Sequence, residues 1–186
     1  RILYAPNFWE FAMEFLSLNQ IEIRGISRID LCADFNNFAT MHPKTLIEGF
    51  AAKSLRHIGR GVVSLAFDHR VMHGEYGVNY TGLTFGTHSS DAHVYLYNKT
   101  FELDTQGDKP WIKARWRRVG LDISDVWRLE VSIKSQGLKF KDKETKEIKQ
   151  ISAAMLEDAP ELDKIYHTYI RKLFAFIRNK KDIKNV

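Results

Sequence analysis

Hydrophobic and polar residues alternate along several parts of the chain, and this period of two predicts β-strands. Apolar residues spaced three or four apart predict amphipathic helices instead. The predicted strands cover residues 21–36, 62–69, 80–87, 91–103 and 126–135, and the predicted helices cover 7–18, 43–59, 110–119 and 161–182. The charged stretch 138–150 is expected to be an exposed hairpin or loop. This order predicts an α+β fold with an antiparallel sheet of the split βαβ (ferredoxin-like) type, with helices on one face and an open second face.

Three of the predicted strands divide their side chains in the same way. Residues two apart in a strand point to the same side, so each strand has one apolar side and one polar side. The polar sides carry Arg28, Asp30, Cys32 and Asp34, then His93, Tyr95, Tyr97 and Lys99, then Arg128, Glu130 and Ser132. Neighbouring strands would bring Asp30, Asp34, Glu130 and Tyr97 together. A solvated sheet face whose charges pair with one another gives the same pattern, so periodicity alone assigns no function.

Three carboxylates on one face need compensation, because like charges at short range destabilise each other. A divalent cation would compensate the negative charge of the carboxylates, and carboxylate oxygens are suitable ligands for magnesium or manganese. The expected cofactor is therefore Mg²⁺ or Mn²⁺, with Asp30, Asp34 and Glu130 as ligands.

Length and composition narrow the class of protein. The 186 residues are expected to form a single domain over 1–186, with a core at about 21–135, and Arg1 at the start indicates a piece of a longer chain. The lone cysteine, Cys32, excludes an intrachain disulfide and a Cys-based zinc site and favours the reducing cytoplasm. No apolar run is long enough to span a membrane. The net charge of +5 favours a polyanionic partner without proving one.

The predicted helix 110–119 combines aromatic and basic residues. Phosphate contacts and base stacking on DNA are one interpretation. A helix with one buried tryptophan and a solvated basic side is the other. The candidate DNA-contacting residues on it are Trp111, Lys113, Arg115, Arg117 and Arg118.

Three segments together resemble the signature blocks of the Rep-trans type replication initiation factors. This family comprises rolling-circle plasmid initiators and related relaxases of conjugative elements. The segments are RIDLCADF, GLTFGTHSSDAHVYLYNKTFEL, which contains Tyr97-Asn98-Lys99 and Glu102, and WRLEVSIK, which contains Arg128 and Glu130. The chain departs from the family at His93 and Tyr95, where arginine is common, and at Thr87-His88. It has no His-hydrophobe-His motif, so carboxylates are expected to hold the metal.

The resemblance implies site-specific nicking and rejoining of DNA through a 5′-phosphotyrosyl intermediate. Tyr97 would be the nucleophile, with Lys99 and Arg128 holding the phosphate oxygens. Tyr95 is the rival nucleophile, or a residue that contacts DNA. The implied partners are a single-stranded or hairpin origin, a helicase and a second copy of the chain, in the bacterial cytoplasm near a plasmid or the nucleoid.

Two other functions remain open from the sequence. One is a DNA-binding module that recognises an origin without catalysis. The other is a metal-dependent nuclease that uses water, with Tyr97 only positioning the substrate. His93 either assists a proton transfer near the tyrosines or is an ordinary surface histidine, which is the more common case.

Overall fold

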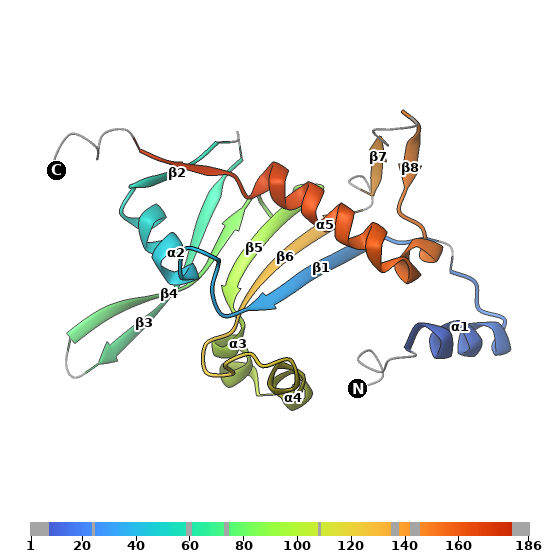
Figure 1. Ribbon diagram of the computed structural model, residues 1–186, viewed down its shortest axis with the longest axis horizontal. Helices are drawn as coiled ribbons and strands as arrows, with labels where there is room; N and C mark the ends of the chain where they lie inside the picture. Colours follow the sequence, from blue (N-terminus) through green and yellow to red (C-terminus); the bar gives the residue numbers. More distant parts are fainter. Residues whose placement is uncertain are drawn as a thin grey trace.

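The computed structural model describes residues 8–23, 25–58, 61–72, 75–107, 109–134, 138–141 and 146–179. Its centre is a five-stranded sheet in the order β1-β6-β5-β4-β3, with every neighbouring pair antiparallel (Figure 1). The strands are β1 (Arg28–Phe35), β3 (Val63–Met72), β4 (Glu75–Phe85), β5 (Ala92–Asn98) and β6 (Trp127–Lys134). The predicted α+β class with an antiparallel sheet is confirmed.

The connection from β1 to β3 gives the sheet its split βαβ character. It runs through α2 (Pro43–Ala51) to the opposite edge of the sheet. Since each neighbouring pair is antiparallel, β1 and β3 are parallel, with β6, β5 and β4 inserted between them. The insertion places β6 between β1 and β5, so the three strands that carry the predicted polar positions are neighbours.

One face of the sheet forms the main hydrophobic core. Its buried residues come from β4, β5 and β6 and from α2 and α5 (Ala159–Leu173), which crosses this face (Figure 1). Pro43 begins α2, and its N-cap His42 accepts a hydrogen bond from the Lys44 amide at 3.1 Å. The core residues include Leu46, Ile47, Leu83, Phe85, Val94, Leu96, Trp127, Val131, Ile133 and Ile165. Both helices therefore cover the apolar face, as expected.

Two helices lie together at one end of the sheet, α3 (Lys99–Gln106) and α4 (Pro110–Arg118) (Figure 1). They enclose a second, smaller core made of Leu103, Ile112, Trp116 and Val126. This end is where β5 finishes and β6 begins, so α3 and α4 adjoin the polar side chains of both strands.

The remaining elements lie outside the main sheet. Two short pairs are antiparallel, β2 (Leu55–His57) with β9 (Phe176–Arg178) and β7 (Lys139–Lys141) with β8 (Ile148–Gln150). The second pair gives the hairpin expected in the charged stretch. The helix α1 (Phe8–Leu18) lies apart from the sheet, and a 3-10 helix, η2, covers Ala153–Glu157 (Figure 1). Among the described ranges, no helix is long and apolar enough to cross a membrane.

Several predicted boundaries were wrong, and capping or pairing explains them. The strand predicted at 91–103 ends at Asn98, whose side chain caps α3 by accepting from the Phe101 amide at 2.8 Å. The helix predicted at 43–59 ends at Ala51, and the helix predicted at 161–182 ends at Leu173. The segments after both helices pair with each other as β2 and β9, a long-range contact that local periodicity does not encode. The strand predicted at 21–36 begins only at Arg28.

Candidate active site

The strand register places the predicted polar side chains in rows across one face of the sheet. Because directly paired residues share a face, each row crosses β1, β6 and β5. The rows are Asp34–Arg128–Tyr97, Cys32–Glu130–Tyr95 and Asp30–Ser132–His93. The expectation of a shared polar face is therefore confirmed. The roles of its residues are not tested by the register.

Tyr97 lies on this face near the end of β5 that leads into α3, and it is only 9% exposed. Its hydroxyl donates a hydrogen bond to Glu130 Oε2 at 3.2 Å. Its ring stacks on Tyr95, with centroids 4.5 Å apart and an angle of 23° between planes. The ammonium of Lys99 lies 5.4 Å from the centroid of the Tyr97 ring. Tyr97 is thus held between an aromatic ring and a cation, with its oxygen fixed on a carboxylate.

Gly82 on β4 provides the space for this arrangement. It is paired with Tyr97 across the sheet. A Cβ at position 82 would lie 2.8 Å from Tyr95 Cε2 and 3.0 Å from the Tyr95 hydroxyl oxygen, which is too close. The absence of a side chain therefore lets the Tyr95 ring lie over β4 and stack on Tyr97.

The surroundings of Tyr97 keep its phenol protonated. Burial raises its pKa well above the ordinary value, and the negative charge of Glu130 raises it further, while Arg128 opposes the shift. The pKa of Glu130 is raised as well, by burial and by the charge of Asp30. A carboxylate with a raised pKa is a better proton acceptor, so Glu130 is suited to act as a general base toward Tyr97.

Arg128 is held by a two-pronged ion pair. Its Nε donates to Asp34 Oδ1 at 2.6 Å and its Nη2 donates to Asp34 Oδ2 at 2.8 Å. Trp116 on α4 donates its indole N–H to Asp34 Oδ2 at 2.8 Å. Burial alone would lower the pKa of Arg128, but the bonds to Asp34 outweigh it and the pKa is raised. The guanidinium therefore stays charged and fixed beside Tyr97.

Lys99 was predicted to lie on the strand, and this was wrong, because it is the first residue of α3. It is 3% exposed and donates a hydrogen bond to Glu102, one helical turn further on. Although its backbone is helical, the side chain still reaches the Tyr97 ring. The resemblance motif contained Glu102, but the sequence assigned it no role, and its i,i+3 spacing from Lys99 was the available signal.

The three predicted metal ligands are engaged separately. Asp34 is bound by Arg128 and Trp116, Asp30 accepts from Arg28 Nε at 2.8 Å, and Glu130 accepts from the Tyr97 hydroxyl. Within the described residues, no three His, Cys, Asp or Glu side chains form a group that could hold a metal ion. The arrangement of these carboxylates therefore does not fit the predicted metal site, whose existence stays a prediction.

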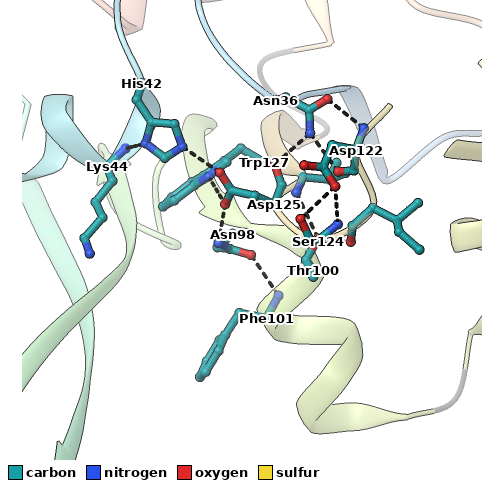
Figure 2. A network of polar contacts seen from close by, with 12 residues as sticks. Asn36, His42, Lys44, Asn98, Thr100, Phe101, Asp122, Ser124, Asp125 and Trp127 are labelled. Atoms are coloured by element: carbon teal, nitrogen blue, oxygen red, sulfur yellow. Dashed lines mark hydrogen bonds and ion pairs between the residues drawn. The ribbon is translucent and has the colours of Figure 1, made fainter. Parts of the chain in front are cut away.

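A polar network at the end of the sheet was missed by sequence reasoning (Figure 2). The carboxylate of Asp125 accepts from His42 Nε2 at 2.6 Å, from Asn98 Nδ2 at 3.2 Å and from Trp127 Nε1 at 2.9 Å. His42 and Asn98 are the N-caps of α2 and α3. One loop carboxylate thus links both helix starts to β6. Asn98 lies 27 residues and His42 lies 83 residues from Asp125 in the sequence, so no local pattern identifies them as its partners.

The basic helix α4 has the buried tryptophan and the exposed basic side of the second interpretation, while its contact with DNA stays a prediction. Trp116 is buried and Trp111 half-buried, so the helix packs through a tryptophan, while three arginines, Arg115, Arg117 and Arg118, are exposed. Lys113 donates to Asp104. The arginines are available for an anionic partner.

His93 is not a surface histidine, because it is only 7% exposed and packs edge-on against His88. Burial lowers its pKa, and the nearby charge of His88 lowers it further. It lies two rows away from Arg128 on the polar face, next to Ser132.

A cavity of about 350 Å³ opens beside Tyr97, between the sheet and α3. Its lining includes Tyr95, Tyr97 and Glu130 from the sheet and Phe101 and Glu102 from α3. Tyr97 and Glu130, which share a hydrogen bond, both line this cavity.

No protein-family model matches the chain, and no curated protein matches it in sequence. Among solved structures, the chain is similar to the rolling circle replication initiator protein from Geobacillus stearothermophilus, with 17% identity and a TM-score of 0.49. The match covers 89% of this chain and 50% of that one, so the chain spans about half its length.

Proposed function

We propose that the protein nicks and rejoins single-stranded DNA through Tyr97, as an initiator of rolling-circle replication or conjugative transfer. The observation that carries the proposal is the hydrogen bond from the Tyr97 hydroxyl to Glu130, with Arg128 paired to Tyr97 across the strands and Lys99 over its ring. The resemblance to the Rep-trans blocks independently selects Tyr97, since the Tyr-Asn-Lys motif ends β5 at this position.

The proposed reaction is a transesterification. As the Tyr97 oxygen forms a bond to phosphorus, the phenolic proton passes to Glu130 and the bond from phosphorus to the 3′ oxygen breaks. The 3′ oxygen leaves and takes a proton from solvent, which yields a 5′-phosphotyrosyl enzyme and a free 3′-OH. One phosphodiester replaces another, so the reverse reaction can rejoin the strand.

Two cations would stabilise the charge that develops on the phosphate. Arg128 has its Nε and Nη2 engaged with Asp34, which leaves Nη1 to donate to a phosphate oxygen. Lys99 carries its charge over the ring of the nucleophile. The exposed arginines of α4 would contact the DNA backbone further along the strand.

A requirement for magnesium or manganese is a separate proposal. The reaction as written uses only side chains of this chain, and the carboxylates as arranged do not form a metal-binding group. Comparing activity in Mn²⁺ with activity in EDTA tests this proposal without deciding the identity of the nucleophile.

The test is covalent trapping on a denaturing gel with end-labelled, randomised single-stranded oligonucleotides. We expect the wild type to form an adduct that Tyr97→Phe loses and Tyr95→Phe keeps. Tyr80→Phe, a change on β4 at a residue that packs against the main core, is the matched control and should keep the adduct.

Each other outcome overturns the proposal in a defined way. An adduct kept in Tyr97→Phe and lost in Tyr95→Phe moves the nucleophile to Tyr95. Cleavage without an adduct indicates a nuclease that uses water. Binding without cleavage indicates an origin-recognition module.

A further inference from the structure

We propose that the cavity beside Tyr97 binds one unstacked nucleobase of the DNA strand and prefers guanine. The inference rests on the proposed function, because the bound base would be the one next to the phosphate that Tyr97 attacks. At about 350 Å³ the cavity lies near the lower end of the range for small-molecule sites, roughly 300–1,000 Å³. That size suits a single planar group rather than a larger ligand.

The aromatic walls suit a base. Tyr95 from the sheet and Phe101 from α3 both line the cavity. Both side chains are half-exposed. Tyr95 is held flat by its stacking on Tyr97 and by the space above Gly82. Stacking of bases on fixed aromatic rings is a general source of affinity for single-stranded DNA.

The cavity is lined by several polar side chains, among them Thr81, Asn98 and Thr105, and two of its polar residues are carboxylates. Glu102 and Glu130 line it, and each has one oxygen engaged, by Lys99 and by the Tyr97 hydroxyl respectively. Among the described residues, none donates a hydrogen bond to Oε1 of either glutamate. Carboxylate oxygens accept hydrogen bonds, so the group of a ligand that faces them should be a hydrogen-bond donor.

The donors of the four bases differ. Guanine carries N1–H and the N2 amino group side by side on its Watson–Crick edge, so it can donate twice to one carboxylate. Adenine and cytosine offer one amino group beside a ring acceptor. Thymine offers a single N–H that lies between two carbonyl oxygens, and a carboxylate repels these oxygens. The cavity should therefore rank guanine first and thymine last.

The test measures binding without chemistry, in the Tyr97→Phe protein. Fluorescence anisotropy compares a short oligothymidine with the same oligonucleotide carrying one central guanine, adenine or cytosine. We expect the guanine oligonucleotide to bind about tenfold more tightly than oligothymidine, the size typical of a two-point contact to a base. Equal binding of all four overturns the inference.

Glu102→Gln in the same protein separates base recognition from simple electrostatics. Removing a negative charge should strengthen binding of oligothymidine, yet the guanine preference should fall to less than about twofold because an amide presents a donor as well as an acceptor. Glu48→Gln on the exposed side of α2 makes the same charge change and should keep the preference. A guanine preference that survives Glu102→Gln excludes Glu102 as its origin and overturns the assignment.

These outcomes are distinct from failure of the proposed function. A wild-type protein that forms no covalent adduct while Tyr97→Phe still selects guanine would refute the nicking proposal and leave the base site standing. An adduct with no base preference would do the reverse. Binding that depends on Mn²⁺ and ignores base identity would show that the cavity holds a cation.

Discussion

At the scale of single residues, Glu130 illustrates how function and stability oppose each other. Its carboxylate is partly buried and lies near the negative charge of Asp30, and both the burial and this charge raise its pKa. The bond from Tyr97 and the charges of Arg128 and Lys99 only partly offset them. The folded state therefore holds the ionised form of Glu130 at a cost in free energy.

Glu130→Gln is expected to raise the stability of the protein at neutral pH and to abolish most nicking. Because the pKa is raised on folding, the cost of ionisation is present above the folded pKa and vanishes as the pH falls below the ordinary value of 4.5. The gain in the midpoint of thermal unfolding should thus be present at pH 7 and disappear near pH 4. Loss of the proton acceptor should slow adduct formation by about 10²–10⁴-fold.

Glu48→Gln is the matched control for this prediction, since Glu48 is exposed on α2. It should change neither the pH dependence of unfolding nor the rate of adduct formation. A Glu130→Gln protein that is less stable at pH 7 than at pH 4, relative to wild type, would show that the carboxylate is a net stabilising group.

At the scale of elements, the transition from β5 to α3 positions the site. Asn98 directly follows Tyr97, the proposed nucleophile, caps α3 through its Oδ1 and binds Asp125 through its Nδ2 (Figure 2). The first residue of the capped helix is Lys99, whose ammonium lies over the Tyr97 ring. A single asparagine therefore sets the direction in which the chain leaves the candidate active site.

Asn98→Ala is expected to lower the free energy of unfolding by about 1 kcal/mol, the usual loss for a helix N-cap. It should also slow adduct formation, because the start of α3 and with it Lys99 would shift. Chemical denaturation and the trapping assay measure the two effects.

Asp158→Ala removes the N-cap of α5, where the Asp158 carboxylate accepts from the Glu161 amide at 3.0 Å. It should cost a similar free energy and leave nicking unchanged, since α5 packs on the apolar face. Equal effects of both variants on nicking would mean that lost stability alone explains Asn98→Ala.

At the scale of the whole molecule, the two faces of the sheet serve different purposes. Helices α2 and α5 cover the apolar face, while α3 and α4 stand at one end of the sheet and contact its polar face (Figure 1). Trp116 joins α4 to Asp34 and hence to Arg128, so the exposed arginines of α4 border the proposed site. DNA that reaches Tyr97 should pass these arginines.

Replacing Arg115, Arg117 and Arg118 together by alanine should weaken binding of single-stranded DNA regardless of sequence. In a plot of log affinity against log salt concentration, each lost phosphate contact reduces the steepness of the slope by about 0.7. Losing three contacts should therefore reduce it by about 2. The control variant replaces three exposed cations of α5, Lys164, Arg171 and Lys172, and should leave the slope nearly unchanged. Equal reductions in both variants would indicate a non-specific effect of net charge.

Local patterns predicted much of this architecture. Period-two alternation identified β1, β5 and β6 and their polar sides, because an alternating strand must bury one side whatever its neighbours are. The boundaries at Asn98 and Leu173 were not predictable in this way. At Asn98 a side chain ends the strand by capping the next helix, and after Leu173 the chain pairs with residues more than a hundred positions earlier.

The sequence by itself determined which side chains share a face, since that follows from the strand period, and its motifs singled out Tyr97. Only the tertiary structure decided which of those side chains bind one another. It pairs Asp34 with Arg128 and Trp116, and it pairs Tyr97 with Glu130. The reason is physical: partners of a buried charge or hydroxyl are set by register and helix packing over 33 to 94 residues of sequence, and no local propensity encodes such contacts.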